Sequence, residues 1–425
     1  MFKAAVIGAG STYTPELIEG FIERRGSLPF DDIALMDIDE KRLEIVGNLA
    51  KRQLAESGYK GGILMTRDLD RALDGASFVF AQVRVGKMAA RIKDEKIPLK
   101  YNLLGQETTG AGGFMKALRT IPVIMGVASN MENLSADGAW LINFSNPSGI
   151  IAEAVLRHTG INMIGLCNGP IGMLKQITKT IGTGDFEYEY VGLNHLAWIT
   201  SVKKRGEDEN LVAALAGTSV AAMANIPTMG FDPALLRAVP YIPSSYLSYY
   251  YMHAEQVKKC VNAEKTRGEI CLELEDSLFR QYADPNLKIK PPELEKRGGA
   301  MYSTAALSAA DSIANDKRES HIVSAINRGA LPFLDDGDVI EAQCELGRDG
   351  IIPKPVSVYN DYVKGLTQAV KAYEKLTVRA SLEGSRDAAL AALLAHPLIG
   401  DFTKAKPMLD EMLEANREYL PMFFS

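Results

Sequence analysis

The sequence predicts an α/β fold: a Rossmann-type, doubly wound parallel sheet followed by a mixed α+β, largely helical domain. Three observations support this prediction. Short β-rich runs alternate with helical patterns up to about residue 167, a glycine-containing loop follows the first run, and the hydrophobic pattern changes after residue 184. Strands that alternate with helices are typical of a parallel sheet covered by helices on both faces.

Six strand candidates lie in the first part of the chain, and each is a short apolar run. They cover residues 3–9, 32–38, 61–67, 76–83, 139–145 and 162–168. Between several of them, apolar residues recur at helical spacing, as in residues 40–57 and 113–133. The alternation ends with the last of these strands, so we expect the first domain to cover residues 1–168.

A different pattern begins after residue 184. Residues 186–202 alternate aromatic or aliphatic side chains with polar ones and precede a charged turn at 203–210, which predicts antiparallel strands. From about residue 233 onward helical patterns dominate, including residues 356–380 and 386–395. A chain of 425 residues is too long for one simple core. We therefore expect a second domain over residues 169–425 that shares one cleft with the first.

Composition and charge argue against several classes of protein. The formal net charge of −6 gives no support to a nucleic acid or a membrane surface as partner. The N-terminus has the pattern of a buried strand rather than of a signal peptide, and no apolar stretch approaches the roughly 20 residues of a membrane span. The four cysteines show no paired short spacing, which is typical of a reducing compartment. We expect a cytoplasmic protein.

The loop after the first strand has the features of a dinucleotide site. Gly8 and Gly10 stand where a backbone turns sharply and approaches a pyrophosphate, and the next helix points its positive end there. Asp37 ends the second strand, where a carboxylate accepts hydrogen bonds from a ribose and favours NAD over NADP. Tyr13 departs from the usual small residue, and a βα turn without a ligand is the alternative. The predicted NAD-binding residues are Gly8, Gly10, Ser11, Thr12 and Asp37.

A cysteine and a histidine in the middle of the chain suggest a metal site. Cys167 ends the strand at 162–168, and His195 lies in a later strand, next to Asn194. A thiolate and a neutral imidazole are good ligands for a divalent metal, and two protein ligands leave positions for substrate oxygens. The alternative is a small buried thiol and a hydrogen-bonded core histidine.

Five stretches, in order, resemble the NAD- and metal-dependent glycoside hydrolases of family 4. They are GAGSTYTPELI at 8–18, GQETTGAGG at 105–113, NFSNPSG at 143–149, CNGP at 167–170 and GLNHL at 192–196. Tyr13 belongs to this family's own version of the loop. Within the family the sequence most resembles the 6-phospho-β-glucosidases. The resemblance implies a C-terminal domain of the malate and lactate dehydrogenase type, which here would bind metal and substrate.

The resemblance also implies a reaction that differs from the two-carboxylate rule for glycosidases. NAD would take a hydride from C3 of the sugar and return it later. The C3 ketone acidifies the C2 proton, a base removes that proton, the C1 substituent leaves by elimination, and water adds. A metal on Cys167 and His195 would polarise the C3 oxygen. It is usually manganese in the family, although the softness of a thiolate alone favours zinc.

Further site residues follow from the family pattern. The base is a tyrosine, for which Tyr246 is the best match and Tyr241 the second. Asn168 stands where relatives that act on α-linked substrates have an aspartate that protonates the leaving group, and an amide has no such acidity, so a β-glycoside is favoured.

A 6-phosphate is a dianion, and cationic and amide side chains should bind the substrate. Arg91, Asn146 and Arg267 match family positions that do so, Asn168 is expected to contact the substrate as well, and Arg297 is a weaker match. The loop at 105–113, with Glu107, Thr108 and Thr109, is expected to line the sugar pocket. The expected partners are a phosphorylated disaccharide or β-glucoside and, by resemblance, further copies of the chain in a homodimer or homotetramer.

Other functions remain open at this point. A 2-hydroxy acid dehydrogenase of the malate or lactate type would share the fold, but it uses a His–Asp pair and an arginine clamp and needs no metal. A regulator that binds NAD without catalysis is a second possibility. A family 4 enzyme that acts on another glycoside is a third.

Overall fold

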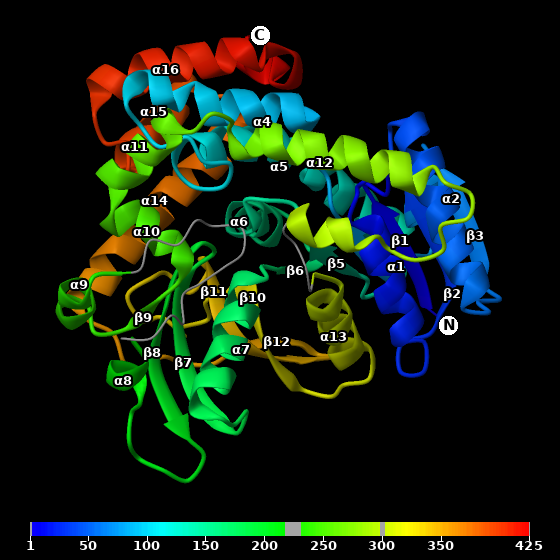
Figure 1. Ribbon diagram of the computed structural model, residues 1–425, viewed down its shortest axis with the longest axis horizontal. Helices are drawn as coiled ribbons and strands as arrows, with labels where there is room; N and C mark the ends of the chain where they lie inside the picture. Colours follow the sequence, from blue (N-terminus) through cyan, green and yellow to red (C-terminus); the bar gives the residue numbers. More distant parts are fainter. Residues whose placement is uncertain (1, 217–230, 298–301, 425) are drawn as a thin grey trace.

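The computed structural model describes residues 2–216, 231–297 and 302–424 (Figure 1). Its main sheet has nine strands in the order β12-β11-β10-β6-β5-β4-β1-β2-β3. The first six strands in the chain are parallel and follow the Rossmann order 3-2-1-4-5-6. They are β1 (Phe2–Ile7), β2 (Phe30–Met36), β3 (Gly62–Thr66), β4 (Phe78–Ala81), β5 (Trp140–Asn143) and β6 (Asn162–Gly165). The predicted fold class and all six predicted strands are confirmed.

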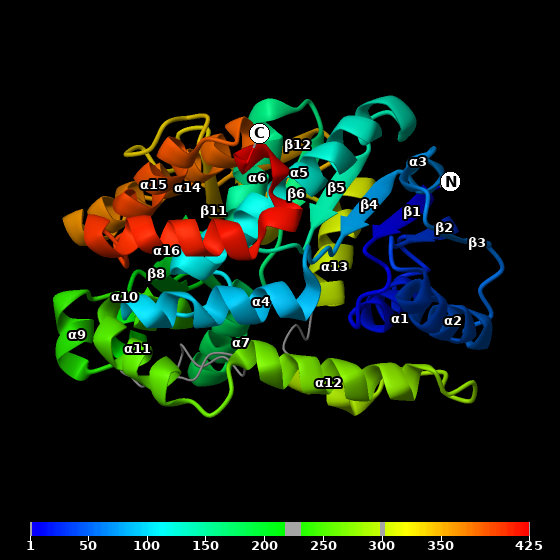
Figure 2. The same ribbon diagram turned by 90° about the horizontal axis from the view of Figure 1, so that it is seen from above.

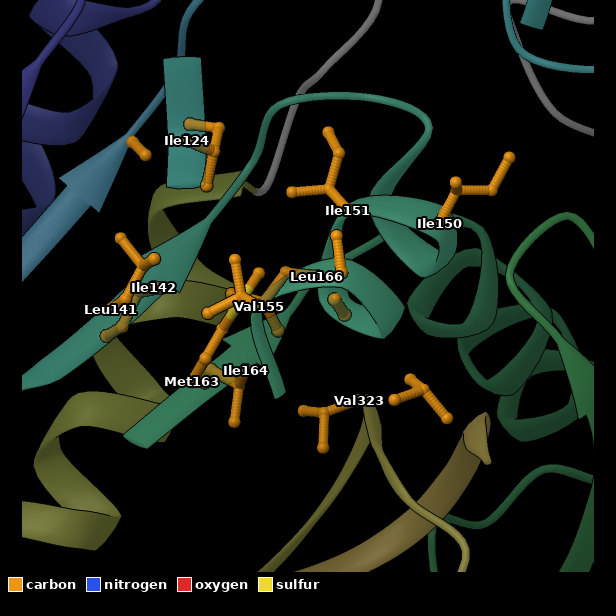
Figure 3. Packing of buried hydrophobic residues seen from close by; sticks show 14 of the residues in the cluster. Ile124, Leu141, Ile142, Ile150, Ile151, Val155, Met163, Ile164, Leu166 and Val323 are labelled. Carbon is orange, nitrogen blue, oxygen red and sulfur yellow. The ribbon is translucent and has the colours of Figure 1, made fainter. Parts of the chain in front are cut away.

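Helices cover both faces of this sheet. Figure 2 shows α1 (Thr14–Glu23), α2 (Glu40–Glu56) and α13 (Tyr302–Ala314) on one side, and α3 (Leu69–Leu73), α5 (Gly110–Leu134) and α6 (Ser148–His158) on the other. The strands between them are buried, which is the reason for their nearly continuous apolar runs. Figure 3 shows part of this core, where Leu141, Ile142, Met163 and Ile164 of two strands pack with Ile150, Ile151 and Val155 of α6.

Three further strands extend the sheet beyond β6. They are β10 (Glu319–Ile326), β11 (Val339–Gly347) and β12 (Gly350–Pro353), and all three pair in antiparallel fashion. The expectation that helices dominate after residue 233 is therefore wrong for this segment. Polar and charged residues, such as Glu341 in β11, interrupt the apolar pattern there, and the strands are held by pairing with distant parts of the chain.

A second, small sheet contains β7 (Phe186–Leu193), β8 (Leu196–Lys204) and β9 (Ile242–Pro243). The predicted antiparallel pairing is confirmed. The prediction that His195 lies in a strand is wrong, because residues 186–202 form two strands and the alternation continues through a two-residue turn of Asn194 and His195. His195 has a φ of +65°, a left-handed conformation that is uncommon for a residue with a side chain. The charged segment at 203–210 begins in the last residues of β8 and does not form the hairpin turn.

Helices make up most of the remainder. They are α4 (Lys87–Lys96), α7 (Gly169–Ile181), α8 (Val212–Ala216), α9 (Pro233–Ala238), α10 (Ser248–Tyr251), α11 (His253–Asn262), α12 (Arg267–Tyr282), α14 (Asp361–Glu383), α15 (Arg386–Ala395) and α16 (Phe402–Ala415). The predicted helix at 386–395 coincides with α15. The helix predicted from residue 356 starts at Asp361, because the side chain of Asn360 caps its first turn. Within the described residues, no helix combines the length and apolarity that a membrane crossing requires.

Candidate active site

A cavity of about 1280 Å³ opens at the carboxyl ends of β1, β2 and β4, where open α/β sheets bind their ligands. Most of the predicted site residues line it. They are Gly8, Gly10, Ser11, Asp37, Arg91, Asn146, Asn168, Tyr246 and Arg267, together with Arg297, Glu107 and Thr108. Thr12, Cys167 and His195 are buried beside this lining rather than part of it. The backbone oxygen of Thr12 accepts a hydrogen bond from the Tyr282 hydroxyl at 2.8 Å, so Thr12 ties the glycine loop to α12.

The glycine loop packs tightly between the ends of β2 and β4. Gly8 has a φ of +86°, and a Cβ there would lie 2.9 Å from the backbone oxygen of Gln82. The backbone N–H of Gly10 donates to Asp37 Oδ2 at 2.8 Å. A carboxylate has further acceptor sites, so Asp37 can still accept hydrogen bonds from ribose hydroxyls in the cavity. This arrangement fits a dinucleotide with its ribose on Asp37 and its phosphates at the start of α1.

Tyr13 occupies the position at which a dinucleotide-binding loop usually has its third small residue, and in the structure its side chain makes specific contacts. It directly precedes α1, and its ring lies 5.6 Å from the guanidinium carbon of Arg297 in a cation–π contact. Burial raises the pKa of the Tyr13 phenol even though Arg297 acts in the opposite direction. Both residues line the cavity, so Tyr13 joins the glycine loop to the second half of the chain.

Glu107 lies at the centre of a cluster of cations. Its carboxylate is 2.7 Å from Arg84, 3.1 Å from Arg91 and 3.0 Å from Lys116. Burial alone would raise the pKa of Glu107, but these three cations hold it well below its usual range. Burial and Arg84 lower the pKa of Lys116 to about 7. All four side chains line the cavity, so a charged network of opposite signs faces any ligand there.

The sequence argument missed Arg84 and Lys116. Lys116 lies in α5, a helix whose first three turns are entirely buried, including Phe114 and Leu118 on either side of it. A lysine inside such an apolar helix is itself a signal, because a buried ammonium group needs a partner. That partner, Glu107, lies nine residues away in the loop before the helix.

Arg91 and Arg267 line the cavity but differ in their surroundings. Arg91 is only 6 % exposed, and its guanidinium contacts Glu95 at 2.8 Å in addition to Glu107. Arg91 is therefore not a solvated surface cation. Arg267 is half-buried at the first position of α12, and its Nη2 donates to the backbone oxygen of Lys296 at 2.8 Å.

Tyr246 and His195 lie side by side. Their rings are stacked, with centroids 4.0 Å apart and planes at 20°. Tyr246 lines the cavity from the short helical turn η2 (Ser245–Leu247), whereas Tyr241, the second candidate for the base, is buried and does not line it. Of the two tyrosines, Tyr246 is the one that a ligand in the cavity can reach.

Cys167 and His195 are both buried, and His195 lies against this tyrosine. The Cys167 sulfur accepts a hydrogen bond from the Gly169 N–H at 3.4 Å, and burial raises the pKa of its thiol. Burial and Lys116 lower the pKa of His195 to about 3, so its imidazole is neutral near pH 7, and its buried Nδ1 has no hydrogen-bond partner among the described residues.

These two side chains offer a soft sulfur and an orphaned nitrogen, a donor set that fits a divalent metal. Among the described residues, no group of three or more His, Cys, Asp or Glu is arranged to hold a metal ion. A metal here would therefore need oxygen ligands from substrate or water, as catalytic sites with open positions do.

Comparison with known proteins places the chain in a family. The model of the family 4 glycosyl hydrolases matches residues 3–183, and the model of their C-terminal domain matches residues 190–399. The chain belongs to family 4 of the glycosyl hydrolases.

Individual relatives narrow the comparison. A probable 6-phospho-β-glucosidase of Bacillus subtilis (strain 168) is 43 % identical, covering 100 % of this chain and 98 % of the relative. The 6-phospho-β-glucosidase of Thermotoga maritima, solved with NAD and glucose 6-phosphate, superposes with a TM-score of 0.91 at 36 % identity over 99 % of both chains. A second structure of that enzyme, which also contains manganese, gives a TM-score of 0.89 at 34 % identity over 99 % of both chains.

A more distant likeness concerns the fold alone. Malate dehydrogenase from Plasmodium falciparum superposes with a TM-score of 0.50 at 12 % identity, over 92 % of this chain and 100 % of that protein. The expected likeness to dehydrogenases of this type is confirmed at the level of fold.

Proposed function

We propose that this protein is an NAD- and divalent-metal-dependent 6-phospho-β-glucosidase. It hydrolyses 6-phospho-β-glucosides to glucose 6-phosphate and an aglycone or sugar. The observation that supports this most directly is that one cavity joins the glycine loop and Asp37 to Tyr246, which stacks on His195. A cofactor loop and a candidate base on one cavity are what oxidation at C3 followed by deprotonation at C2 requires. The relatives of the same family, at 43 % and 36 % identity, support the same activity.

In this reaction NAD, when bound, accepts and returns the C3 hydride, and a metal held by Cys167 and His195 polarises the C3 oxygen. Tyr246 removes the proton from C2, and loss of the C1 substituent follows. The phenol needs a lowered pKa for this role, because an ordinary tyrosine ionises near about pH 10. The positive charge of the metal ion on His195, the neighbour of Tyr246, is the proposed cause of the lower phenol pKa.

The rest of the lining orients the substrate. Arg91, Asn146 and Arg267 are the proposed contacts to the phosphorylated sugar, since charged hydrogen bonds are the strong ones for a dianion. Asn168 lies directly after Cys167 and lines the cavity, and its amide cannot act as a general acid. This favours a β-linked substrate, whose leaving group does not depend on a side-chain acid at this position.

The proposal is tested with p-nitrophenyl 6-phospho-β-glucoside, with and without NAD and Mn²⁺. Nitrophenol should be released only when both are present, and no net NADH should accumulate. Stoichiometric NADH from a 2-hydroxy acid, insensitive to chelators, would support the dehydrogenase alternative. Tight NAD binding without turnover of any glycoside would support the regulator.

A further inference from the structure

Behind Cys167 and His195 lies a buried carboxylate that the proposed reaction does not use. Glu341 belongs to β11, the strand that the sequence pattern did not predict, and its side chain is sealed from solvent. We propose that Glu341 is a positioning residue for the two metal ligands, acting through Asn194. The inference rests on the proposed function, because it assumes that Cys167 and His195 bind a metal.

The contacts form a continuous chain from Glu341 to the ligands. One oxygen of Glu341 accepts from the Tyr190 hydroxyl at 2.5 Å, and the other accepts from Asn194 Nδ2 at 2.9 Å. The side chain of Asn194 also acts on the Cys167 thiol, because it opposes the rise in pKa that burial causes. Its Oδ1 accepts from the Gly149 N–H at 3.2 Å. Both ends of the Asn194 amide are therefore held, and its orientation is set by groups outside the turn.

Asn194 also affects the backbone conformation of His195, because the two residues form the turn between β7 and β8. A residue other than glycine keeps a φ of +65° only where its surroundings enforce it. The imidazole gives little help, since within the part of the chain that the structure describes Nδ1 has no hydrogen-bond partner, and the ring is held by stacking on Tyr246. The fixed Asn194 side chain thus anchors the turn that presents His195.

The charge of Glu341 supports the same role. Two nearby carboxylates, those of Glu153 and Glu374, both form ion pairs with Lys371, and the distance between Lys371 Nζ and Glu153 is 2.9 Å. In the described parts of the chain, by contrast, no lysine or arginine forms an ion pair with Glu341. A buried carboxylate without a cation is costly, and a divalent ion on Cys167 and His195 would supply the missing positive charge. Outer partners that orient metal ligands in this way commonly change metal affinity when they are removed.

The test measures Mn²⁺ binding to the metal-free protein by electron paramagnetic resonance of the free ion. Glu341→Ala and Asn194→Ala should each raise the Kd for Mn²⁺ by about 10- to 100-fold. Glu341→Gln should lose less Mn²⁺ affinity than Glu341→Ala, because the amide still accepts from Asn194 and donates to Tyr190 but no longer carries the negative charge. NAD affinity should be unchanged in all three. Ser312→Ala, which removes a buried hydrogen bond to β11 at the Leu346 oxygen, controls for general loosening of that strand and should bind Mn²⁺ normally.

Unchanged Mn²⁺ affinity in Glu341→Ala or Asn194→Ala would overturn the proposal, as would a loss in Glu341→Gln equal to that in Glu341→Ala. Thermal unfolding without metal reports whether each variant folds. If Glu341→Ala does not fold, Asn194→Ala decides the question. Failure of the proposed function itself looks different: wild-type protein would bind no Mn²⁺, or Cys167→Ala and His195→Ala would bind it as tightly as wild type.

Discussion

The imidazole of His195 lies flat against the phenol ring of Tyr246, at a centroid distance of 4.0 Å. The two residues come from different loops, but the small sheet joins them. His195 lies in the turn between β7 and β8, and β8 pairs with β9 just before the turn that contains Tyr246. One three-stranded sheet therefore presents a proposed metal ligand and the proposed base side by side, which links the metal's charge to the proton transfer.

The first prediction concerns the metal ligands. Cys167→Ser and His195→Ala should each lower kcat/KM by at least about 100-fold, because a Lewis acid contributes several kcal/mol to the transition state. His195→Phe keeps a ring for stacking on Tyr246 but has no nitrogen, and it should be as inactive as His195→Ala. NAD affinity, measured by fluorescence, should be nearly unchanged. Full activity of Cys167→Ser or of either His195 variant would exclude the metal assignment.

The second prediction concerns Arg91. Arg91→Ala should lower kcat/KM for a phosphorylated β-glucoside by a factor that corresponds to about 2–4 kcal/mol of transition-state binding. The substitution removes a buried charged contact and leaves Glu95 and Glu107 without the arginine that they share. Arg91→Lys keeps the charge but not the planar fork, and it should recover only part of the loss. Thermal unfolding separates a loss of activity from a loss of folding. Normal kinetics in Arg91→Ala would remove Arg91 from the substrate site.

The third prediction concerns substrate choice. Phosphorylated β-glucosides should be hydrolysed with a kcat/KM at least about tenfold above that of unphosphorylated ones, because each charged hydrogen bond contributes about 1.5–3 kcal/mol. Arg267→Ala should narrow this ratio, while the rate on an unphosphorylated glucoside should hardly change. Equal kcat/KM on plain cellobiose would contradict the role of the phosphate. Efficient turnover of α-linked phosphorylated substrates would contradict the inference from Asn168.

The fourth prediction concerns pH and a histidine that does not line the cavity, His396. Burial lowers the pKa of His396 to about 3, and its Nδ1 accepts from the Leu398 N–H at 3.1 Å. Between the unfolded pKa near about 6.5 and the folded pKa, the unfolded chain binds a proton that the folded protein does not. The free energy of unfolding is therefore highest above pH 6.5 and falls as the pH drops, by up to about 1.4 kcal/mol per pH unit for this group.

His396→Phe tests this in urea titrations between about pH 7 and pH 4. The variant keeps a ring between Tyr250 and Tyr373 but loses the acceptor for Leu398, so it should be less stable near neutrality. Its stability should fall less steeply with acid than that of wild type. Exposed His158→Gln is the control and should leave the slope unchanged. Equal slopes in wild type and His396→Phe would show that His396 does not titrate as described.

Local signals explain how much of this protein could be predicted from its sequence. The strands β1 to β6 are short apolar runs, and the glycine loop precedes a helix. The pattern of neighbouring residues was therefore sufficient to predict these elements. Strand β11 was missed because its charged residue Glu341 can be buried only when it is hydrogen-bonded to two distant residues. These are Tyr190 and Asn194, which lie 151 and 147 residues away in the chain. The turn at His195 was missed because the alternating pattern continues on both sides of it.

The charged network shows the same limit. The loop with Glu107 was expected near the sugar, but its three cations come from the loop after β4, from α4 and from α5. No spacing along the chain relates these elements. Lys116 was the one local clue, as a charge inside an apolar helix, and its partner became visible only in the folded protein.

The last prediction tests the reaction itself. Direct displacement at C1 by paired carboxylates never breaks the C2–H bond, whereas elimination must break it. A base such as Tyr246, which lines the cavity, should exchange the captured proton with water before one returns to C2. Turnover in deuterium oxide should therefore give glucose 6-phosphate with deuterium at C2 and with the hydrogen at C3 largely retained. Nuclear magnetic resonance of the product distinguishes the two positions.

Tyr246→Phe keeps the ring that stacks on His195 but removes the phenol, so activity should fall steeply while NAD and Mn²⁺ still bind. Tyr241→Phe is the matched control, because Tyr241 is buried outside the cavity lining. A product with only protium at C2 would exclude the elimination pathway. Near-normal activity of Tyr246→Phe, with deuterium still at C2, would keep the pathway and transfer the role of base to another residue of the cavity lining.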